Sequence, residues 1–207
     1  MTKKGGVIVW IVGDATIKGS ETGTSFKQAL YFKEIGFNLH DTMIYQKDAC
    51  AFPESNRYYP HFEYIFILSK GKPNTFNQIM DKPNNNANTV IRRSTQRELD
   101  GSLIPTNATK RNLKRKVKRF GVRGNVWKYS VGNGKSASDK IAMNHPAIFP
   151  EKLAYDHIIS WSNPCDKILD PMMGSGTVGK MCKLLKRKFI GIEINKKYFK
   201  ICEKRCQ

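Results

Sequence analysis

One stretch near the end of the chain reads as a strand, a glycine turn, a helix and a second strand. Apolar residues in Lys167–Asp170 lead into the turn Gly174–Thr177, and Phe189–Ile194 forms the second strand. Glycines let a backbone approach a ligand without a Cβ in the way, and the first N–H groups of the next helix can hold an anionic group. Glu193 stands about 20 residues beyond the turn, where an acidic side chain binds a ribose diol. The stretch therefore predicts a nucleoside pocket.

Two classes of cofactor fit such a pocket. The string from Gly174 to Gly179 satisfies the dinucleotide pattern G-x-G-x-x-G, which alone is weak support. Only 28 residues follow Gly179, too few for the second half of a dinucleotide fold. Asp170 beside the turn would repel a pyrophosphate, but it suits a cationic ligand that carries an amino acid group. S-adenosylmethionine has this chemistry, and an ordinary glycine-rich turn is the remaining alternative.

Three segments together resemble a known family. Asn144–Ala154, Leu169–Thr177 and Ile190–Ile194 are similar to the C-terminal third of the bacterial and phage DNA amino-methyltransferases, which act on adenine N6 or cytosine N4. Their order resembles the β arrangement of this family, in which the catalytic half precedes the cofactor half. Three upstream segments look like the middle sheet segments of the family: 5–14, 36–45 and 61–71.

The resemblance implies S-adenosylmethionine as the methyl donor and assigns its binding residues. These are Phe149, Asp170, Met172, Gly174, Ser175, Gly176, Thr177 and Glu193. The family usually has phenylalanine where this chain has Met172. A methionine can fill the same apolar space because its side chain is adaptable, so the departure concerns the affinity for the cofactor more than its identity.

The catalytic element of the family is absent from these residues. It is a tetrapeptide that begins with Asp, Asn or Ser, continues with two prolines and ends with an aromatic residue. Its polar atoms accept hydrogen bonds from the exocyclic amino group of the target DNA base, which is flipped out of the duplex, and its aromatic ring stacks on that base. Asn163–Asp166 and Asp170–Met173 lack the second proline and the aromatic residue. No catalytic residue is therefore assigned. In the family, the central strand that bears this tetrapeptide lies between Val7–Val12 and the strand ending at Asp170. Without it, three outcomes are possible: the two strands pair directly, a second polypeptide supplies the missing strand, or the chain is a fragment that is unstable alone.

The charge of the chain indicates a polyanionic partner. The formal net charge is +19, more than solubility needs and most simply explained by nucleic acid. From Gly101 to Ser138 there are ten lysines and arginines and no acidic residue, where the family keeps its target-recognition insert. Charge runs are usually solvated faces, but contact with the backbone of double-stranded DNA is the better interpretation here. The residues expected to bind DNA are Lys110, Arg111, Lys114, Arg115, Lys116, Lys118, Arg119 and Arg123.

The predicted fold is α/β, a Rossmann-like methyltransferase domain with a mainly parallel sheet. Residues 1–71 supply its middle sheet segments, 72–144 a basic target-recognition insert, and 145–207 its cofactor-binding segment. The continuous apolar run Val7–Val12 predicts a strand buried on both faces in a parallel sheet. Four helices are predicted: 24–34, 150–162, 178–188 and 198–205.

The cysteines and the apolar runs indicate the compartment. The five cysteines show no paired C-x-x-C spacing, so we expect free thiols and no metal site. No apolar run approaches the roughly 18 residues of a membrane span, and no signal peptide precedes the fold. The sequence therefore predicts a cytoplasmic protein without a membrane partner.

The predicted function is site-specific methylation of an exocyclic amino group on a flipped DNA base. Adenine N6 is favoured over cytosine N4 because it is the commoner activity in the family that the chain resembles. The alternative is a non-catalytic DNA-binding remnant, or a partner subunit of a split methyltransferase. Methylation of RNA or of a small molecule is disfavoured by the long basic insert.

Overall fold

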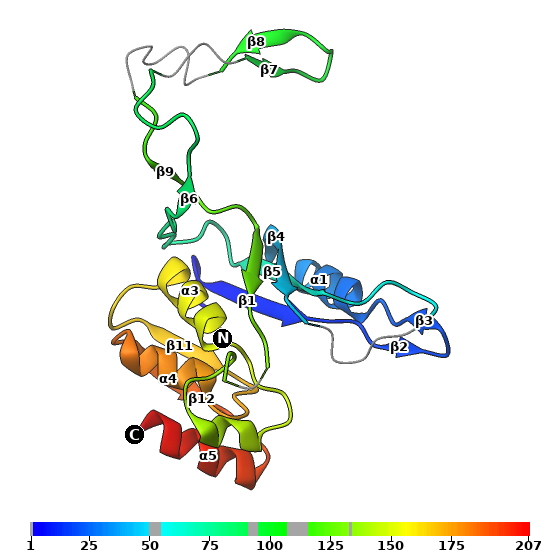
Figure 1. The fold of residues 1–207 in the computed structure, drawn as a ribbon, viewed down its shortest axis with the longest axis vertical. Helices are drawn as coiled ribbons and strands as arrows, with labels where there is room; N and C mark the ends of the chain where they lie inside the picture. Colours follow the sequence, from blue (N-terminus) through cyan, green and yellow to red (C-terminus); the bar gives the residue numbers. More distant parts are fainter. Residues whose placement is uncertain (1, 50–54, 91–94, 107–115, 133) are drawn as a thin grey trace. The chain divides into compact units, whose positions relative to one another are not determined.

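The computed structural model describes residues 2–49, 55–90, 95–106, 116–132 and 134–207 (Figure 1). The chain forms two compact units: unit 1 is Met1–Asn77 with Asn125–Gln207, and unit 2 is Gln78–Gly124. Unit 2 is shorter than the predicted insert 72–144, because residues after Gly124 return to unit 1 as a strand and a short helix. No helix in the described part of the chain is both long and apolar enough to cross a membrane.

Unit 1 contains a four-stranded sheet in the order β1-β5-β4-β10. Its strands are β1 (Val7–Val12), β4 (Asn38–Lys47), β5 (Phe62–Ser69) and β10 (Val126–Tyr129). β5 is antiparallel to β1 and to β4, whereas β10 is parallel to β4. The prediction that β1 is buried in a parallel sheet is wrong for the described residues. All six of its residues are half-buried, and β1 pairs antiparallel with β5, its one partner among the described strands.

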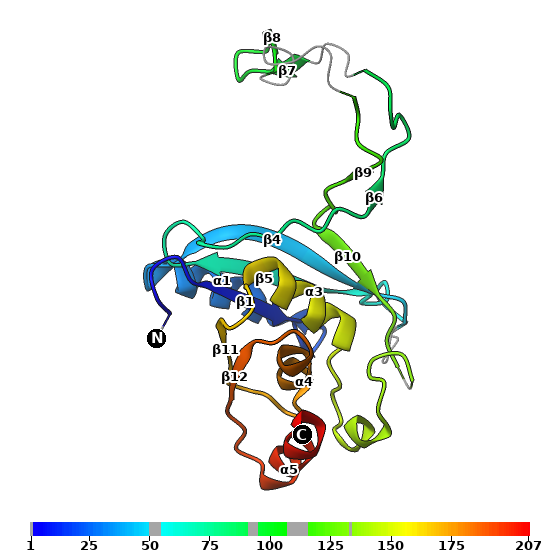
Figure 2. The same cartoon turned by 90° about the vertical axis from the view of Figure 1, so that its left-hand side faces the viewer.

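Helix α1 (Thr24–Glu34), which matches its predicted bounds, covers one face of this sheet (Figure 2). Ala29 of α1 packs against Phe66 and Leu68 of β5. Side chains alternate along a strand, so the neighbouring Ile65 and Ile67, both fully buried, point to the opposite face.

The opposite face of the sheet contacts α3 (Glu151–Trp161). Trp127 of β10 stacks on His157 of α3, with ring centroids 4.6 Å apart. The hydroxyl of Tyr129 donates a hydrogen bond to Asp156 at 2.8 Å. Helices on both faces of a sheet are the arrangement expected for an α/β domain.

The C-terminal segment builds a second, two-stranded sheet in unit 1. β11 (Lys167–Asp170) pairs in parallel with β12 (Lys188–Gly191). Between them lies α4 (Thr177–Leu184), which shares an apolar core with α3, and α5 (Lys196–Cys206) follows. The predicted helix 178–188 is too long, since Lys186 adopts a positive φ of 59° and Lys188 begins β12.

The remaining elements are short. Unit 1 also contains the strand pair β2 (Thr16–Ile17) with β3 (Ser20–Glu21), and the 3-10 helix η1 (Lys140–Asn144). In unit 2, β6 (Lys82–Pro83) pairs with β9 (Phe120–Gly121), and β7 (Thr95–Arg97) pairs with β8 (Leu103–Pro105). Both pairs in unit 2 are antiparallel and largely exposed.

Candidate functional site

The glycine turn lies between β11 and α4. Gly174 and Gly176 both have positive φ, 49° and 81°, a conformation that glycine adopts without strain. A Cβ on Gly174 would lie 3.0 Å from Nε2 of His145, and one on Gly176 would lie 2.4 Å from Sγ of Cys202. The backbone conformation and the packing of His145 and Cys202 therefore require these glycines, a reason separate from the predicted approach of a ligand.

Two carboxylates lie at this turn. Oε2 of Glu193, two residues beyond β12, accepts a hydrogen bond from the N–H of Gly174 at 2.9 Å. Asp170 ends β11, and its Oδ1 accepts one from the N–H of Met172 at 3.1 Å. Burial raises the pKa of Asp170; the Met172 N–H opposes this rise and the charge of Glu193 adds to it. The site thus concentrates negative charge at the turn.

These carboxylates fit a cationic ligand. Within the described residues, neither Asp170 nor Glu193 forms an ion pair. A cation bound beside them would relieve the repulsion that helps to raise the pKa of Asp170. S-adenosylmethionine carries both a sulfonium and an ammonium group, and a carboxylate can also accept hydrogen bonds from ribose hydroxyls. The donor set therefore fits this cofactor.

The other predicted cofactor residues differ in their exposure. Ser175 and Thr177 are buried, whereas Met172 is 67% exposed. Phe149 is half-buried and packs against the apolar core shared by α3 and α4. No side chain caps the N-terminus of α4, so Thr177 does not act as a cap. The structure thus brings the predicted residues from 170 to 177 and Glu193 together, and it places Phe149 in the neighbouring core.

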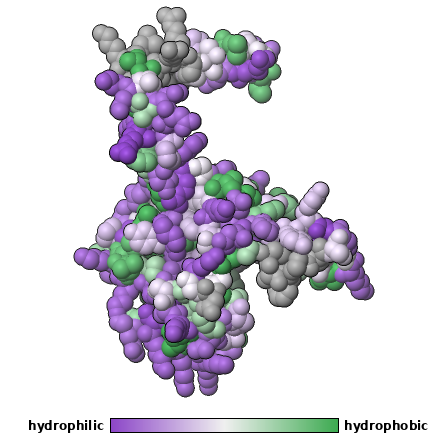
Figure 3. Space-filling view, viewed as in Figure 1, coloured by the Kyte–Doolittle hydropathy of each residue, from purple (hydrophilic) through white to green (hydrophobic). Residues whose placement is uncertain are grey.

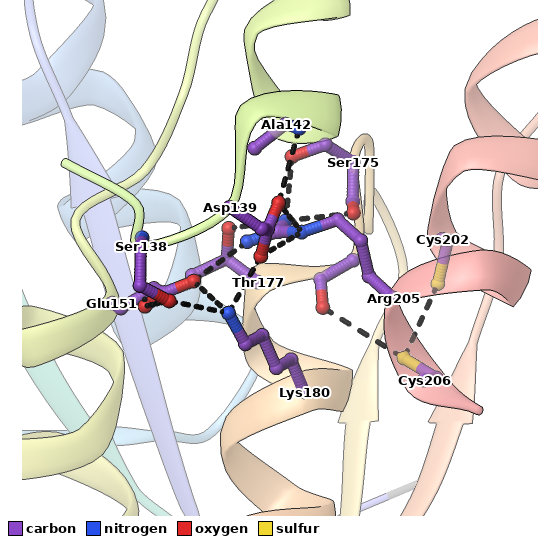
Figure 4. Close-up of polar contacts among 11 residues, drawn as sticks. Ser138, Asp139, Ala142, Glu151, Ser175, Thr177, Lys180, Cys202, Arg205 and Cys206 are labelled. Atoms are coloured by element: carbon purple, nitrogen blue, oxygen red, sulfur yellow. Dashed lines mark hydrogen bonds and ion pairs between the residues drawn. The ribbon is translucent and has the colours of Figure 1, made fainter. Parts of the chain in front are cut away.

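Arg205 of α5 connects the turn to two other elements. Its Nη1 donates to the carbonyl oxygen of Ser175 at 2.8 Å and to the Oγ1 of Thr177 at 3.1 Å (Figure 4). Its Nε lies 3.0 Å from Oδ1 of Asp139, just before η1, and its Nη2 lies 2.9 Å from Oε1 of Glu151 in α3. The guanidinium therefore links α5, the turn, η1 and α3.

Lys180 of α4 completes this ion-pair network. Its Nζ lies 2.5 Å from Oδ2 of Asp139 and 2.7 Å from Oε1 of Glu151. Burial acts to raise the pKa of both Asp139 and Glu151. The hydrogen bonds and charge of Lys180 outweigh this effect, with help from Arg205 at Asp139 and from Ser138 at Glu151. The pKa of each carboxyl group therefore lies below its ordinary value. Two cations and two anions are thus joined in one network.

Sequence reasoning missed the four charged residues of the network. They come from four segments between residues 139 and 205, and no spacing pattern relates them. The one local signal is the Pro150–Glu151 pair at the start of α3, a position where an acidic residue favours the helix dipole. Their proximity is a property of the tertiary structure.

Sulfur atoms also pack at the turn. Sγ of Cys202 lies 3.4 Å from Sδ of Met173 and 3.8 Å from Sγ of Cys206. The hydrogen bond with Cys202 lowers the pKa of Cys206 to about 7, with help from the charges of Arg205 and Lys183 and against the effect of burial. Both cysteines are free thiols, as predicted.

The predicted DNA-binding residues lie partly outside the described structure. Lys110, Arg111, Lys114 and Arg115 fall outside the described residues, and Lys116, Lys118, Arg119 and Arg123 belong to unit 2. Lys116 forms a β-bridge with Val90, and the guanidinium of Arg119 lies 5.4 Å from the centre of the Phe120 ring. Arg123 forms an ion pair with Asp81, so a phosphate at Arg123 would compete with this carboxylate.

The sequence of this chain is similar to those of known DNA methyltransferases. Residues 1–204 match the family described as DNA methylase, the N6 and N4 methyltransferases. The orphan methyltransferase M.BamHII of Bacillus amyloliquefaciens is 57% identical over 207 residues, which cover 99% of this chain and 76% of the relative. The type II methyltransferase M.SmaI of Serratia marcescens is 29% identical over 88% of this chain and 51% of its own length.

Solved structures confirm the predicted Rossmann-like methyltransferase fold. The complex of M1.HpyAVI with S-adenosylmethionine has a TM-score of 0.59 and 25% identity, and the match covers 98% of this chain and 75% of that one. The cytosine-N4-specific PvuII DNA methyltransferase has a TM-score of 0.70 and 18% identity, over 99% of this chain and 65% of that one. The chain belongs to the N6 and N4 DNA methylase family, whose enzymes use S-adenosylmethionine as their cofactor.

Proposed function

We propose that this chain supplies the cofactor-binding and DNA-binding parts of a site-specific methyltransferase that acts on an exocyclic amino group. The paired carboxylates at the glycine turn carry this proposal, since Asp170 and Glu193 form no ion pair within the described residues and so can receive a cationic cofactor. Bound S-adenosylmethionine would supply an electrophilic methyl group. The role of the chain is then to bind and orient this cofactor beside the DNA.

The residues at the turn have distinct roles in this proposal. Glu193 would accept hydrogen bonds from the ribose hydroxyls while the N–H of Gly174 holds its Oε2 in place. Asp170 would face the cationic part of the cofactor, where ionisation of its carboxyl group is favoured by the ligand charge. Arg205 would hold the turn through Ser175 and Thr177, and Lys180 would support Arg205 through the two network carboxylates.

Adenine N6 is the proposed target in preference to cytosine N4. The DNA adenine methyltransferase YhdJ of Escherichia coli (strain K12) is 44% identical to this chain over 80 residues, which are 39% of this chain and 26% of the relative. This local similarity supports adenine. The likeness to the cytosine-N4-specific enzyme, at 18% identity, concerns the fold alone.

Methyl transfer would require a segment other than these 207 residues, because the family's catalytic tetrapeptide does not occur in them. Among the described strands, β1 pairs only with β5, and β11 pairs only with β12. Each strand therefore keeps one edge whose N–H and C=O groups have no described strand partner, and such edges need partners. A strand that carries the tetrapeptide, from a second polypeptide, would pair with both. The second candidate function, a non-catalytic DNA-binding subunit, rests on the same missing tetrapeptide.

Calorimetry tests the cofactor part of the proposal. Replacement of Glu193 by Ala should weaken the binding of S-adenosylmethionine by about 1–3 kcal/mol, since ribose hydroxyls would lose a charged acceptor. Replacement of Glu203 by Ala, at an exposed position on α5, is the matched control and should have no effect. Binding of NADH without binding of S-adenosylmethionine would refute the assignment.

A tritium-transfer assay on unmethylated DNA tests the catalytic part. The pure 207-residue chain should show no measurable transfer, and addition of the polypeptide that bears the tetrapeptide should restore it. Robust turnover by the chain alone would mean that another residue does the work of the tetrapeptide. Absence of transfer after the addition, with normal cofactor and DNA binding, would favour the non-catalytic subunit.

A further inference from the structure

Helix α5 carries four lysines on one side. At about 100° per residue, Lys196, Lys197, Lys200 and Lys204 fall within an arc of about 100°, which we call the lysine face. The buried residues Cys202 and Arg205 lie on the opposite side of the helix, and the buried Ile201 borders the lysine face. The lysine face is therefore separate from the contacts that hold α5 against the glycine turn.

The lysine face borders a pocket. The four lysines, Ile201, and Ile141 and Asn144 of η1 line a cavity of about 560 Å³. All four lysines are exposed, and none forms an ion pair with any residue that the structure describes. The surface over α5 is mostly hydrophilic, as Figure 3 shows in purple. This pocket is open to a negatively charged partner.

Helix stability does not explain the positions of these lysines. Lys196 and Lys197 are the first two residues of α5, Lys200 follows within the next turn, and no acidic residue stands in the first turn. The N-terminal end of a helix carries partial positive charge, so cations in the first turn are unfavourable. Lys196 and Lys197 are thus placed at a cost to the helix, which a partner of opposite charge would offset.

We propose that the lysine face binds the phosphate backbone of duplex DNA, as a second DNA-contacting surface that lies in unit 1 and acts independently of the basic insert in unit 2. The step from Lys196 to Lys204 spans about 12 Å along the helix. One DNA strand presents a phosphate about every 3.4 Å along the duplex axis, so this length corresponds to about three phosphates. Lysines act as mobile point charges, and contacts of this kind hold DNA without reading its sequence.

Salt-dependent DNA binding tests the proposal. The test variant replaces Lys196, Lys197, Lys200 and Lys204 by Ala in the 207-residue chain. The control variant makes the same change in net charge at exposed positions elsewhere in unit 1: Lys3, Lys4, Lys27 and Lys33. Both are titrated with a fluorescent duplex by anisotropy at several salt concentrations without cofactor, so that the result does not depend on methyl transfer.

The slope of log K against log salt should become shallower by about 2–3 in the test variant, because each phosphate that is no longer neutralised removes roughly 0.9 from the slope. In the control variant the slope should change by less than about 1. Equal slopes in the two variants would overturn the proposal. The double variant K200E/K204E changes the net charge by the same amount as the test variant and should also weaken DNA binding, because two attractive charges become repulsive. The outcome would be different for a small-anion site: the unmodified chain would bind inorganic phosphate saturably, and K200E/K204E would lose this binding while its DNA binding stayed unaltered. That result would also overturn the proposal.

An unfolded variant would give a false loss, so each protein is first tested for cooperative thermal unfolding and for binding of S-adenosylmethionine. Lys116→Ala and Lys118→Ala in the insert supply an independent comparison. Because the two surfaces act independently in this proposal, the changes in slope caused by the lysine-face and insert variants should add. Complete loss of the slope in the insert variant alone would show that the lysine face does not touch DNA.

Discussion

Arg205 donates from Nη1 to both the carbonyl oxygen and the hydroxyl of Ser175, at 2.8 and 3.1 Å (Figure 4). Only 1% of the Arg205 side chain is exposed, so water cannot readily replace either hydrogen bond. The conformation of the glycine turn and the seating of α5, 30 residues further along the chain, therefore depend on the same guanidinium.

Replacement of Arg205 by Ala should weaken both folding and cofactor binding. It leaves Asp139 and Glu151 without one of their two cations, and removal of one partner from a buried ion pair costs about 3 kcal/mol or more. We expect the affinity for S-adenosylmethionine to fall by ~10-fold or more, about 1.4 kcal/mol, when measured by calorimetry below the unfolding temperature. Arg205→Lys should recover part of the stability, because it keeps the charge, but less of the affinity, because a single ammonium group cannot reproduce all the hydrogen bonds of the guanidinium. Equal cofactor affinity in wild type and both variants would contradict the positioning role.

Asp170→Asn should separate stability from binding. The pKa of Asp170 is raised above its ordinary 3.8, so the ionised carboxylate disfavours the folded state once the pH exceeds that value. The amide removes this penalty, and the free energy of unfolding of the cofactor-free protein should stay the same or rise. The affinity for S-adenosylmethionine should fall by about 1–3 kcal/mol, because a charged acceptor is removed.

Asp166→Asn is the matched control for this change. Asp166 lies just before the other end of β11, and its Oδ2 accepts a hydrogen bond from the N–H of Asn163 at 2.7 Å. It should alter stability slightly and leave cofactor affinity unchanged. A loss of stability in Asp170→Asn with no loss of affinity would show that the carboxylate serves the fold and not the ligand.

Acid should release the ion-pair network. The pKa values of Asp139 and Glu151 are held below 3.8 and 4.5, respectively, so their ionised forms stabilise the protein fully above about pH 4.5 and lose this effect as the pH falls through the folded-state pKa values. Lys180 behaves in the opposite sense: its pKa is raised above 10.5, and its contribution is lost only as the pH rises through that raised value. Thermal unfolding between about pH 3 and pH 7 should show a steeper acid loss in the wild type than in Asp139→Asn. Parallel curves would place the acid loss elsewhere.

Neutralisation of the basic insert should reduce the salt dependence of DNA binding. The variant replaces Lys114, Arg115, Lys116 and Lys118 by Ala, of which the first two lie outside the described residues. The slope of log K against log salt should fall by roughly 0.9 for each DNA phosphate that the variant leaves without a cationic side chain. An unchanged slope, measured by anisotropy on duplex DNA, would mean that this run of charges is a solvated face.

Much of the cofactor segment was predictable because it is local. The order of strand, turn, helix and strand between residues 167 and 194 follows from an apolar run, two glycines and the next apolar run, all close in the sequence. The bounds of α1 were predicted to the residue, and the predicted sheet segments 36–45 and 61–71 overlap β4 and β5. Patterns of this kind arise from residues that are neighbours along the chain.

The family, the fold class and the cofactor were thus determined by the sequence alone, because the segments that identify them are short and lie close together in the chain. Tertiary structure decided the pairing of β1, the end of α4 and the partners of the turn. Asp139, Glu151, Lys180 and Arg205 meet only after four segments have packed, and the lysine face becomes one wall of a pocket only when α5 lies beside η1. Charges distant in the chain carry no local signature, because ion pairs depend on separation in space, which the fold sets.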